Sequence, residues 1–150
     1  MSSTIFLLCF FTFRIIEKPM KSLIRISDAT IIAIHTIKYF IDSSEASLSA
    51  KKVAEALDVS YNHLSKVIQT LQKAGFLESV RGPAGGYTIT NKGKNAKIKD
   101  ILKLFEGRTS YSICFLNSRV CERDRCKLKE FLIQITDLFN KFADMYISDI

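Results

Sequence analysis

Apolar positions recur at helical spacing in several segments of the chain. Over 28–41 they fall on more than one side of the predicted helix, so this helix should be buried by more than one neighbour, with Asp28 as its N-cap. A shorter helix over 50–57 follows the capping residue Ser49, and a third begins after Ser60 and stops at Gly75. The apolar face of the third helix consists of Leu64, Val67, Ile68 and Leu71. Two helices joined by a three-residue turn predict a helix-turn-helix.

Two short β-prone runs come next, FLESVR over 76–81 and YTIT over 87–90, on either side of the turn sequence GPAGG. They predict a hairpin, the wing of a winged helix. A further helix is predicted over 97–107, ended by Gly107, and a long amphipathic helix follows from Leu128 to Met145. The apolar stripe of this last helix is too long for a small core. We therefore expect it to bind a second copy of the chain, and the alternative is that it packs on its own domain.

These elements predict a mainly α fold with a small β-hairpin. A winged helix-turn-helix domain spans 20–107, a cysteine-bearing loop spans 108–126, and a dimerisation helix spans 127–150. Residues 1–19 stand apart, because the apolar run over 5–13 is too short to span a bilayer and lacks the basic start of a secretory signal. We expect Met20 to be the natural start and 1–19 a doubtful extension. A membrane-docking segment is the alternative.

Charge and cysteine content narrow the function. The 22 Lys and Arg against 15 Asp and Glu give a net charge of +7, which favours a polyanionic partner, although solubility alone would also explain it. Of the four cysteines, Cys9 lies in the doubtful extension, whereas Cys114, Cys121 and Cys126 form an odd-numbered cluster. Disulfide scaffolds prefer even counts, so a reducing cytoplasm and a metal or redox role fit better.

The second helix of the motif is the predicted DNA-reading element. Its outward face carries Asn62, Lys66, Gln69 and Lys73, and in a helix-turn-helix the first residues of this helix lie nearest the base edges of the major groove. A solvated helix face is the alternative for each residue alone, but the wing that follows favours DNA, because a slim glycine-rich tip with Arg81 at its base suits the minor groove. The predicted DNA-binding residues are Ser60, for a phosphate, and Tyr61, Asn62, His63, Lys66, Gln69, Arg81, Gly85 and Gly86.

Three sequence stretches resemble the IscR and NsrR type of winged-helix regulators, the Rrf-two family. They are ISDAT in the first helix, YNHLSKVIQTLQKAGFLESVRGPAGGY across the recognition helix and wing, and the three cysteines that end in CKLKEF. The resemblance covers the chain from Ile24 to the final helix. It implies a homodimer that binds double-stranded promoter DNA, with DNA roles for Asn62, His63, Lys66 and Arg81, and a redox-sensitive cluster.

Thiolates are the usual ligands of iron-sulfur clusters, and the spacing C-x6-C-x4-C supplies three of them in Cys114, Cys121 and Cys126. We favour a 4Fe-4S cluster over 2Fe-2S. The histidine that follows the third cysteine in IscR-like members is absent. NsrR-like members resemble the chain more closely and carry an aspartate at the start of the first helix, matched here by Asp28. That resemblance implies Asp28 of the partner as fourth ligand, the alternative being its N-cap role, and His35 is a weaker candidate.

The resemblance further implies nitric oxide or redox state as the signal, repression as the output, and no enzymatic activity or membrane association. Zinc is a competing metal, although paired C-x2-C knuckles are absent, and a metal-free thiol switch is another alternative. A cysteine-dependent redox enzyme would pair a thiol with His35 or His63, but neither histidine is placed with a third orienting group.

Overall fold

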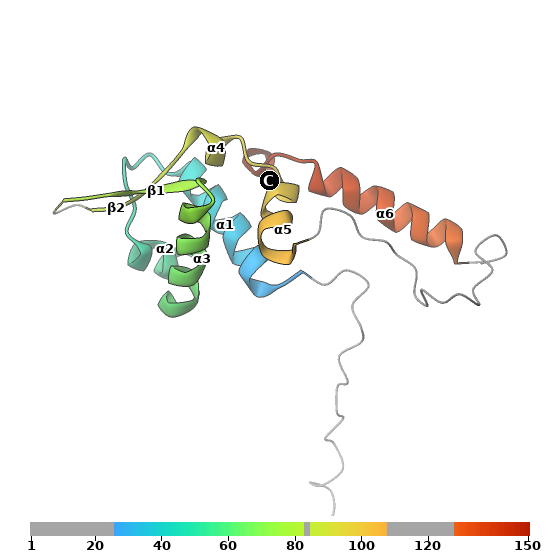
Figure 1. The fold of residues 1–150 in the computed structure, drawn as a ribbon, viewed down its shortest axis with the longest axis horizontal. Coiled ribbons are helices and arrows are strands. Elements are labelled where there is room, and N and C mark those ends of the chain that lie inside the picture. Colours follow the sequence, from blue (N-terminus) through green and yellow to red (C-terminus); the bar gives the residue numbers. More distant parts are fainter. Residues whose placement is uncertain (1–25, 83–84, 108–127) are drawn as a thin grey trace, which may run out of the picture.

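The computed structural model describes residues 26–82, 85–107 and 128–150 (Figure 1). The elements in chain order are α1 (Asp28–Asp42), α2 (Ala50–Ala56), α3 (Tyr61–Lys73), β1 (Leu77–Val80), β2 (Gly86–Ile89), α4 (Asn91–Lys94), α5 (Ile98–Glu106), α6 (Lys129–Ala143) and the 3-10 turn η2 (Ile147–Asp149). The mainly helical fold with one hairpin is therefore confirmed. Residues 1–19 and the three clustered cysteines lie outside the described residues, so what the sequence indicates for them stays a prediction.

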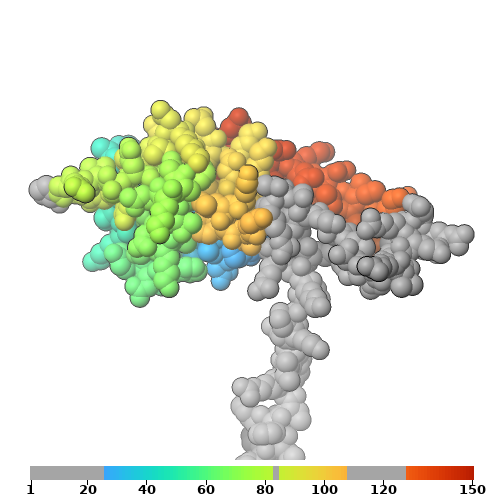
Figure 2. Space-filling view, viewed as in Figure 1, coloured from blue at the N-terminus to red at the C-terminus, as the bar shows by residue number. Residues whose placement is uncertain are grey.

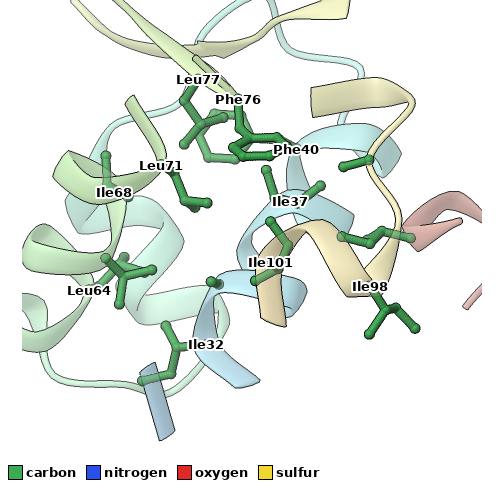
Figure 3. Close-up of a cluster of buried hydrophobic side chains, with 14 of the residues drawn as sticks. Ile32, Ile37, Phe40, Leu64, Ile68, Leu71, Phe76, Leu77, Ile98 and Ile101 are labelled. Carbon is green, nitrogen blue, oxygen red and sulfur yellow. The ribbon is translucent and has the colours of Figure 1, made fainter. Parts of the chain in front are cut away.

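Helix α1 lies at the centre of the core, between α3 on one side and α5 on the other (Figure 3). Ile37 of α1, Leu71 of α3 and Ile101 of α5 are all fully buried, and they lie between the three helices. Burying a side chain of this size stabilises the fold by about 1.5–3 kcal/mol. The predicted burial of α1 on more than one side is thus confirmed, and it makes this helix the element that joins the two halves of the domain.

The N-cap of α1 is Ser27, and the prediction of Asp28 was wrong by one residue. The Ser27 hydroxyl oxygen accepts a hydrogen bond from the Thr30 amide at 3.3 Å, and Asp28 is the first helical residue, with an exposed side chain. Serine and aspartate are both good N-caps, so the adjacent pair left the choice open in the sequence. Ser27 takes the role because its amide and hydroxyl both donate to the Glu106 carboxylate, at 2.9 and 2.7 Å.

The helix-turn-helix forms as predicted. The side chain of Ser49 caps α2 by accepting from the Lys52 amide, and that of Ser60 caps α3 by accepting from the His63 amide, both at 3.2 Å. Between the two helices Asp58 adopts a left-handed φ of 52°, a conformation that aspartate tolerates better than most residues. The sharp turn lets α2 pack against α3.

The wing is a two-stranded antiparallel hairpin with Leu77 opposite Ile89 and Val80 opposite Gly86. A bridge to the stretch before α2 holds it in place, because Leu48 and Tyr87 exchange backbone hydrogen bonds of 2.9 and 2.8 Å. A Cβ on Gly86 would lie 2.5 Å from the Leu48 carbonyl oxygen. The lack of a side chain at this position therefore lets the wing approach the backbone of the domain.

Helix α4 is an element that the sequence analysis did not predict in the basic stretch after the wing. Thr90 caps it by accepting from the Gly93 amide at 3.1 Å. Lys92 of this helix donates to the Ala74 carbonyl at 2.7 Å, and its ammonium lies 4.5 Å from the centre of the Phe76 ring. This lysine satisfies a free carbonyl at the end of α3, so part of the basic stretch supports the recognition helix.

Helix α6 projects away from the rest of the described chain (Figures 1 and 2). Phe139 and Ala143 anchor its C-terminal half in the core, whereas Leu138 is 70% exposed and Phe131 49% exposed. After α6 the chain returns to the core, where Ile147 is fully buried. Among the helices of the described ranges, none is long and apolar enough to cross a membrane.

Candidate nucleic-acid interface

Helix α3 is amphipathic in the way that the sequence predicted. Leu64, Ile68 and Leu71 are fully buried on its inner face. The side chains of the opposite face are exposed, and those predicted to contact DNA are Tyr61, Asn62, Lys66 and Gln69. In Figure 2 the green surface of α3 runs along one side of the molecule, with the wing extending away from it. A convex helix face of this kind fits the major groove, which admits one helix.

Exposed cations lie on this face and at the start of the wing turn. The side chains of Lys66 and Arg81 are exposed, and neither makes an ion pair or hydrogen bond with another described residue. By contrast, Lys52 of α2 is bonded to Glu45, and that hydrogen bond raises the pKa of Lys52. Free cations next to a helix N-terminus favour phosphate, because the helix dipole adds to their field.

Ser60, His63, Gly85 and Gly86 were also predicted to contact DNA, but they differ from the exposed face of α3 in their burial or their hydrogen bonds. The Ser60 oxygen already accepts the capping hydrogen bond, which leaves its hydroxyl proton to donate to a phosphate. His63 is half-buried at the start of α3, so only part of its ring faces outward. Gly85 is exposed in the wing turn, where its amide donates to the Gly82 carbonyl at 2.9 Å, whereas Gly86 packs on Leu48.

Asp28 lies beside the recognition helix. An open depression in the surface is lined by Asp28, Ile31 and Ile32 from α1 and by Val59, Ser60 and His63 from the start of α3. The Asp28 carboxylate makes no hydrogen bond or ion pair with another described residue, and with Ser27 as the N-cap it has no capping role. The N-terminus of α1 therefore brings a free carboxylate next to the first turn of α3. His35, the weaker candidate, is exposed on α1.

Glu106 is a residue of this region that the sequence analysis missed. Its carboxylate oxygen accepts from the Ser27 amide, the Ser27 hydroxyl and the Thr30 hydroxyl, the last at 2.5 Å. Glu106 ends α5, so it ties the C-terminus of that helix to the N-terminus of α1, and it stands eight residues before Cys114 in the sequence. A lone glutamate before a helix-ending glycine carries no sequence signal for such a contact.

The predicted metal ligands cannot be compared as a set, since Cys114, Cys121 and Cys126 lie outside the described residues. Within 26–82, 85–107 and 128–150, no three His, Cys, Asp or Glu side chains come together as a metal site. Asp28 shares the depression with one other residue of these types, His63, and the two do not make up such a group within the described part of the chain.

A family model described as Rrf2, iron-dependent transcriptional regulator, matches residues 26–148. The chain belongs to the Rrf2 family. This confirms the resemblance drawn from the recognition helix and wing, and it assigns the chain to a family of transcription regulators rather than of enzymes. The matched range includes every described element except the last residue of η2, Asp149.

Among curated relatives, BadM of Rhodopseudomonas palustris, named as an HTH-type transcriptional regulator, is 35% identical over 82 residues, covering 55% of this chain and 53% of BadM. The HTH-type transcriptional repressor NsrR of Streptomyces coelicolor is 30% identical over 97 residues, covering 65% of this chain and 66% of NsrR. The chain thus matches between about half and two thirds of the length of these two relatives.

Solved structures of the family share the fold. CymR, the global cysteine regulator of B. subtilis, superposes with a TM-score of 0.65 at 24% identity, over 84% of this chain and 95% of CymR. IscR of T. potens gives a TM-score of 0.61 at 21% identity, over 84% of this chain and 85% of IscR. At these identities the likeness concerns the fold, including the hairpin and the C-terminal helix.

Proposed function

We propose that this Rrf2-family protein is a homodimeric repressor that binds promoter DNA and whose affinity for DNA is controlled by an iron-sulfur cluster. The observation that carries the DNA proposal is the outward face of α3, where Lys66 and three further polar or aromatic side chains are exposed beside a wing that ends at the free cation Arg81. In this proposal α3 enters the major groove and the wing tip reaches the adjacent minor groove.

The DNA proposal predicts a loss of affinity when either free cation is removed. Lys66→Ala and Arg81→Ala should each weaken binding to duplex promoter DNA about 10-fold, equivalent to about 1.4 kcal/mol. Each should also reduce the slope of log affinity against log salt concentration by about one, because one counterion fewer is released on binding. Fluorescence anisotropy titrations at several salt concentrations measure both effects. Lys103→Ala is the matched control, because it removes the same charge from an exposed position on α5, a helix that packs on α1. Equal losses in the control would contradict a specific interface.

The second copy in this proposal binds along α6. Leu128, Phe131, Leu138 and Phe142 are exposed on neighbouring sides of this helix, and the stripe continues into the buried side chains Phe139 and Ala143. A monomer would leave this apolar surface in water, and pairing with the same surface of another chain buries it. Each chain of such a dimer contributes one recognition helix, so the dimer presents two of them to two half-sites.

The donor set fits an iron-sulfur cluster by its chemistry. Cys114, Cys121 and Cys126 supply three thiolates, and the free carboxylate of Asp28 is a candidate for the fourth position, donated to the partner's cysteine segment. The relatives named NsrR and the iron-dependent description of the family support this choice. A bound cluster would supply a centre that nitric oxide and oxygen can attack. The reducing cytoplasm is the compartment that keeps such thiolates available.

Contacts between described residues offer a path from the end of α5, which precedes the cysteine segment, to α3, the recognition helix. Glu106 holds Ser27 and Thr30 at the start of α1, and the same turn of α1 faces Val59, Ser60 and His63 across the open depression. A change in the position of the segment after Glu106 would therefore act on the first turn of α3. Because both half-sites must fit together, a small displacement there lowers the affinity for promoter DNA.

Anaerobic purification tests the cluster directly. The protein should be brown and contain iron and inorganic sulfide, and nitric oxide should bleach it and release promoter DNA. Cys114→Ala, Cys121→Ala and Cys126→Ala should each abolish the colour, whereas Cys9→Ala, in the extension, should keep it. Asp28→Ala should alter the spectrum, and an unchanged spectrum would remove Asp28 from the ligand set.

Protein that stays colourless after reconstitution with iron and sulfide would overturn the cluster proposal. A disulfide between two of the three cysteines in such protein would support a thiol switch on the same fold, and one zinc per chain would support a zinc-containing regulator. The DNA measurements above are independent of this result, because they depend on α3 and the wing.

A further inference from the structure

The segment after α6 is bound to α1 and to the stretch that begins α5 by backbone and side-chain contacts. The Ile98 amide donates to the Met145 carbonyl at 3.1 Å, and the Ile147 amide donates to the Ala96 carbonyl at 2.9 Å. These bonds form an antiparallel bridge in which Lys97 lies opposite Tyr146. The side chain of Ile147 is fully buried in the core cluster. The end of α6 is thus joined to the stretch that begins α5.

Polar contacts at the surface of this segment reinforce the bridge. Lys99 and Asp144 form an ion pair of 2.7 Å, and this hydrogen bond lowers the pKa of Asp144 and raises the pKa of Lys99, so the pair stays ionised at neutral pH. Lys38 of α1 donates to the Ser148 carbonyl at 3.1 Å. The Lys97 ammonium lies 4.9 Å from the centre of the Tyr146 ring.

From these contacts we infer that residues 144–148 act as a joint that sets the separation of the two recognition helices and so selects the spacing of the two operator half-sites. The inference rests on the proposed function, in which α6 pairs with a second copy. The joint packs η2 on α1 while α6 contacts α5, and α1 packs directly on both α5 and α3, so the direction of α6 relative to α3 is fixed within each chain. Two such rigid chains paired along α6 hold their recognition helices at one distance.

The test compares operators of different half-site spacing. An operator is selected from random duplex DNA with the wild-type protein, and versions with one or two base pairs added or removed between the half-sites are prepared. The wild-type protein should bind the selected spacing about 100-fold more tightly than the altered ones, because one recognition helix then misses its half-site. Ile147→Ala should reduce this ratio to about 5-fold or less, and Ile147→Val should preserve it.

A purely structural role of Ile147 would give a different result. It would lower the affinity for all operators and for a single half-site by the same factor and leave the ratio at its wild-type value, which would overturn the inference. A wild-type protein without preference for spacing would overturn it as well. If Ile147→Ala does not fold, the double variant Lys38→Ala/Asp144→Ala is measured instead, because it removes the contacts of Lys38 with the Ser148 carbonyl and of Asp144 with Lys99 and changes no residue of the hydrophobic core.

Sedimentation of the wild-type protein separates failure of the inference from failure of the proposed function. A monomer, or a protein without affinity for the selected operator, would contradict the proposed function itself. A dimer that binds the operator, combined with an unchanged spacing ratio in the joint variants, would contradict only the role of residues 144–148.

Discussion

Replacing Leu138 by glutamate should convert the proposed homodimer into a monomer and lower the affinity for a two-half-site promoter at least about 100-fold. Leu138 is 70% exposed on α6, so a charge there costs the isolated chain little, whereas it would be buried unpaired between two copies. Binding as a dimer makes the second half-site an intramolecular contact with a high effective concentration, and the monomer loses this gain. Sedimentation velocity and promoter titrations measure the two effects.

Ile133→Glu is the matched control for this experiment. Ile133 and Phe131 are both 49% exposed on α6, but two residues of helix turn Ile133 about 200° away from Phe131. The Ile133 variant should remain a dimer, and Phe131→Glu should dissociate like Leu138→Glu. A dimer that survives the Leu138 and Phe131 substitutions would show that another surface joins the copies.

The second large effect concerns the packing of α4 under the wing. Gly93→Ala should lower the free energy of unfolding by about 3 kcal/mol, a typical upper cost for forcing an extra methyl group into a packed site. A Cβ on Gly93 would lie 2.3 Å from the Phe76 carbonyl oxygen and 2.7 Å from Cγ1 of Ile89. The Phe76 carbonyl cannot move away without breaking hydrogen bonds, because it also accepts from the Thr90 amide and hydroxyl, both at 3.1 Å.

Thermal unfolding followed by circular dichroism measures this loss, which should lower Tm by about 10 °C for a domain of this size. Lys94→Ala, in the same helix and exposed, should change the free energy of unfolding by less than about 0.5 kcal/mol. An unchanged Tm in the Gly93 variant would mean that α4 does not lie against Phe76 and Ile89.

The helix-turn-helix and the wing are the parts of the protein for which sequence-based prediction worked best. The amphipathic face of α3, its start after Ser60, the cap Ser49 and the hairpin after Gly75 were all correct, because each depends on residues close together in the chain. Two local features were not predicted correctly: the short helix α4 was missed, and Asp28 was named in place of Ser27 as the N-cap of α1, where two good capping residues are adjacent. A contact from Glu106, 79 residues away, decided between them.

What the sequence by itself determined is the class of protein, namely a cationic winged helix with an amphipathic C-terminal helix and three clustered thiols, since periodicity, caps and charge are local properties. Tertiary structure decided how these parts are joined. Glu106 reaches Ser27, Lys92 closes the end of α3, and Ile147 returns to the core beside Ala96. Each of these contacts joins residues well apart in the chain. No local sequence pattern predicts such a contact, because it forms only once the intervening helices have packed.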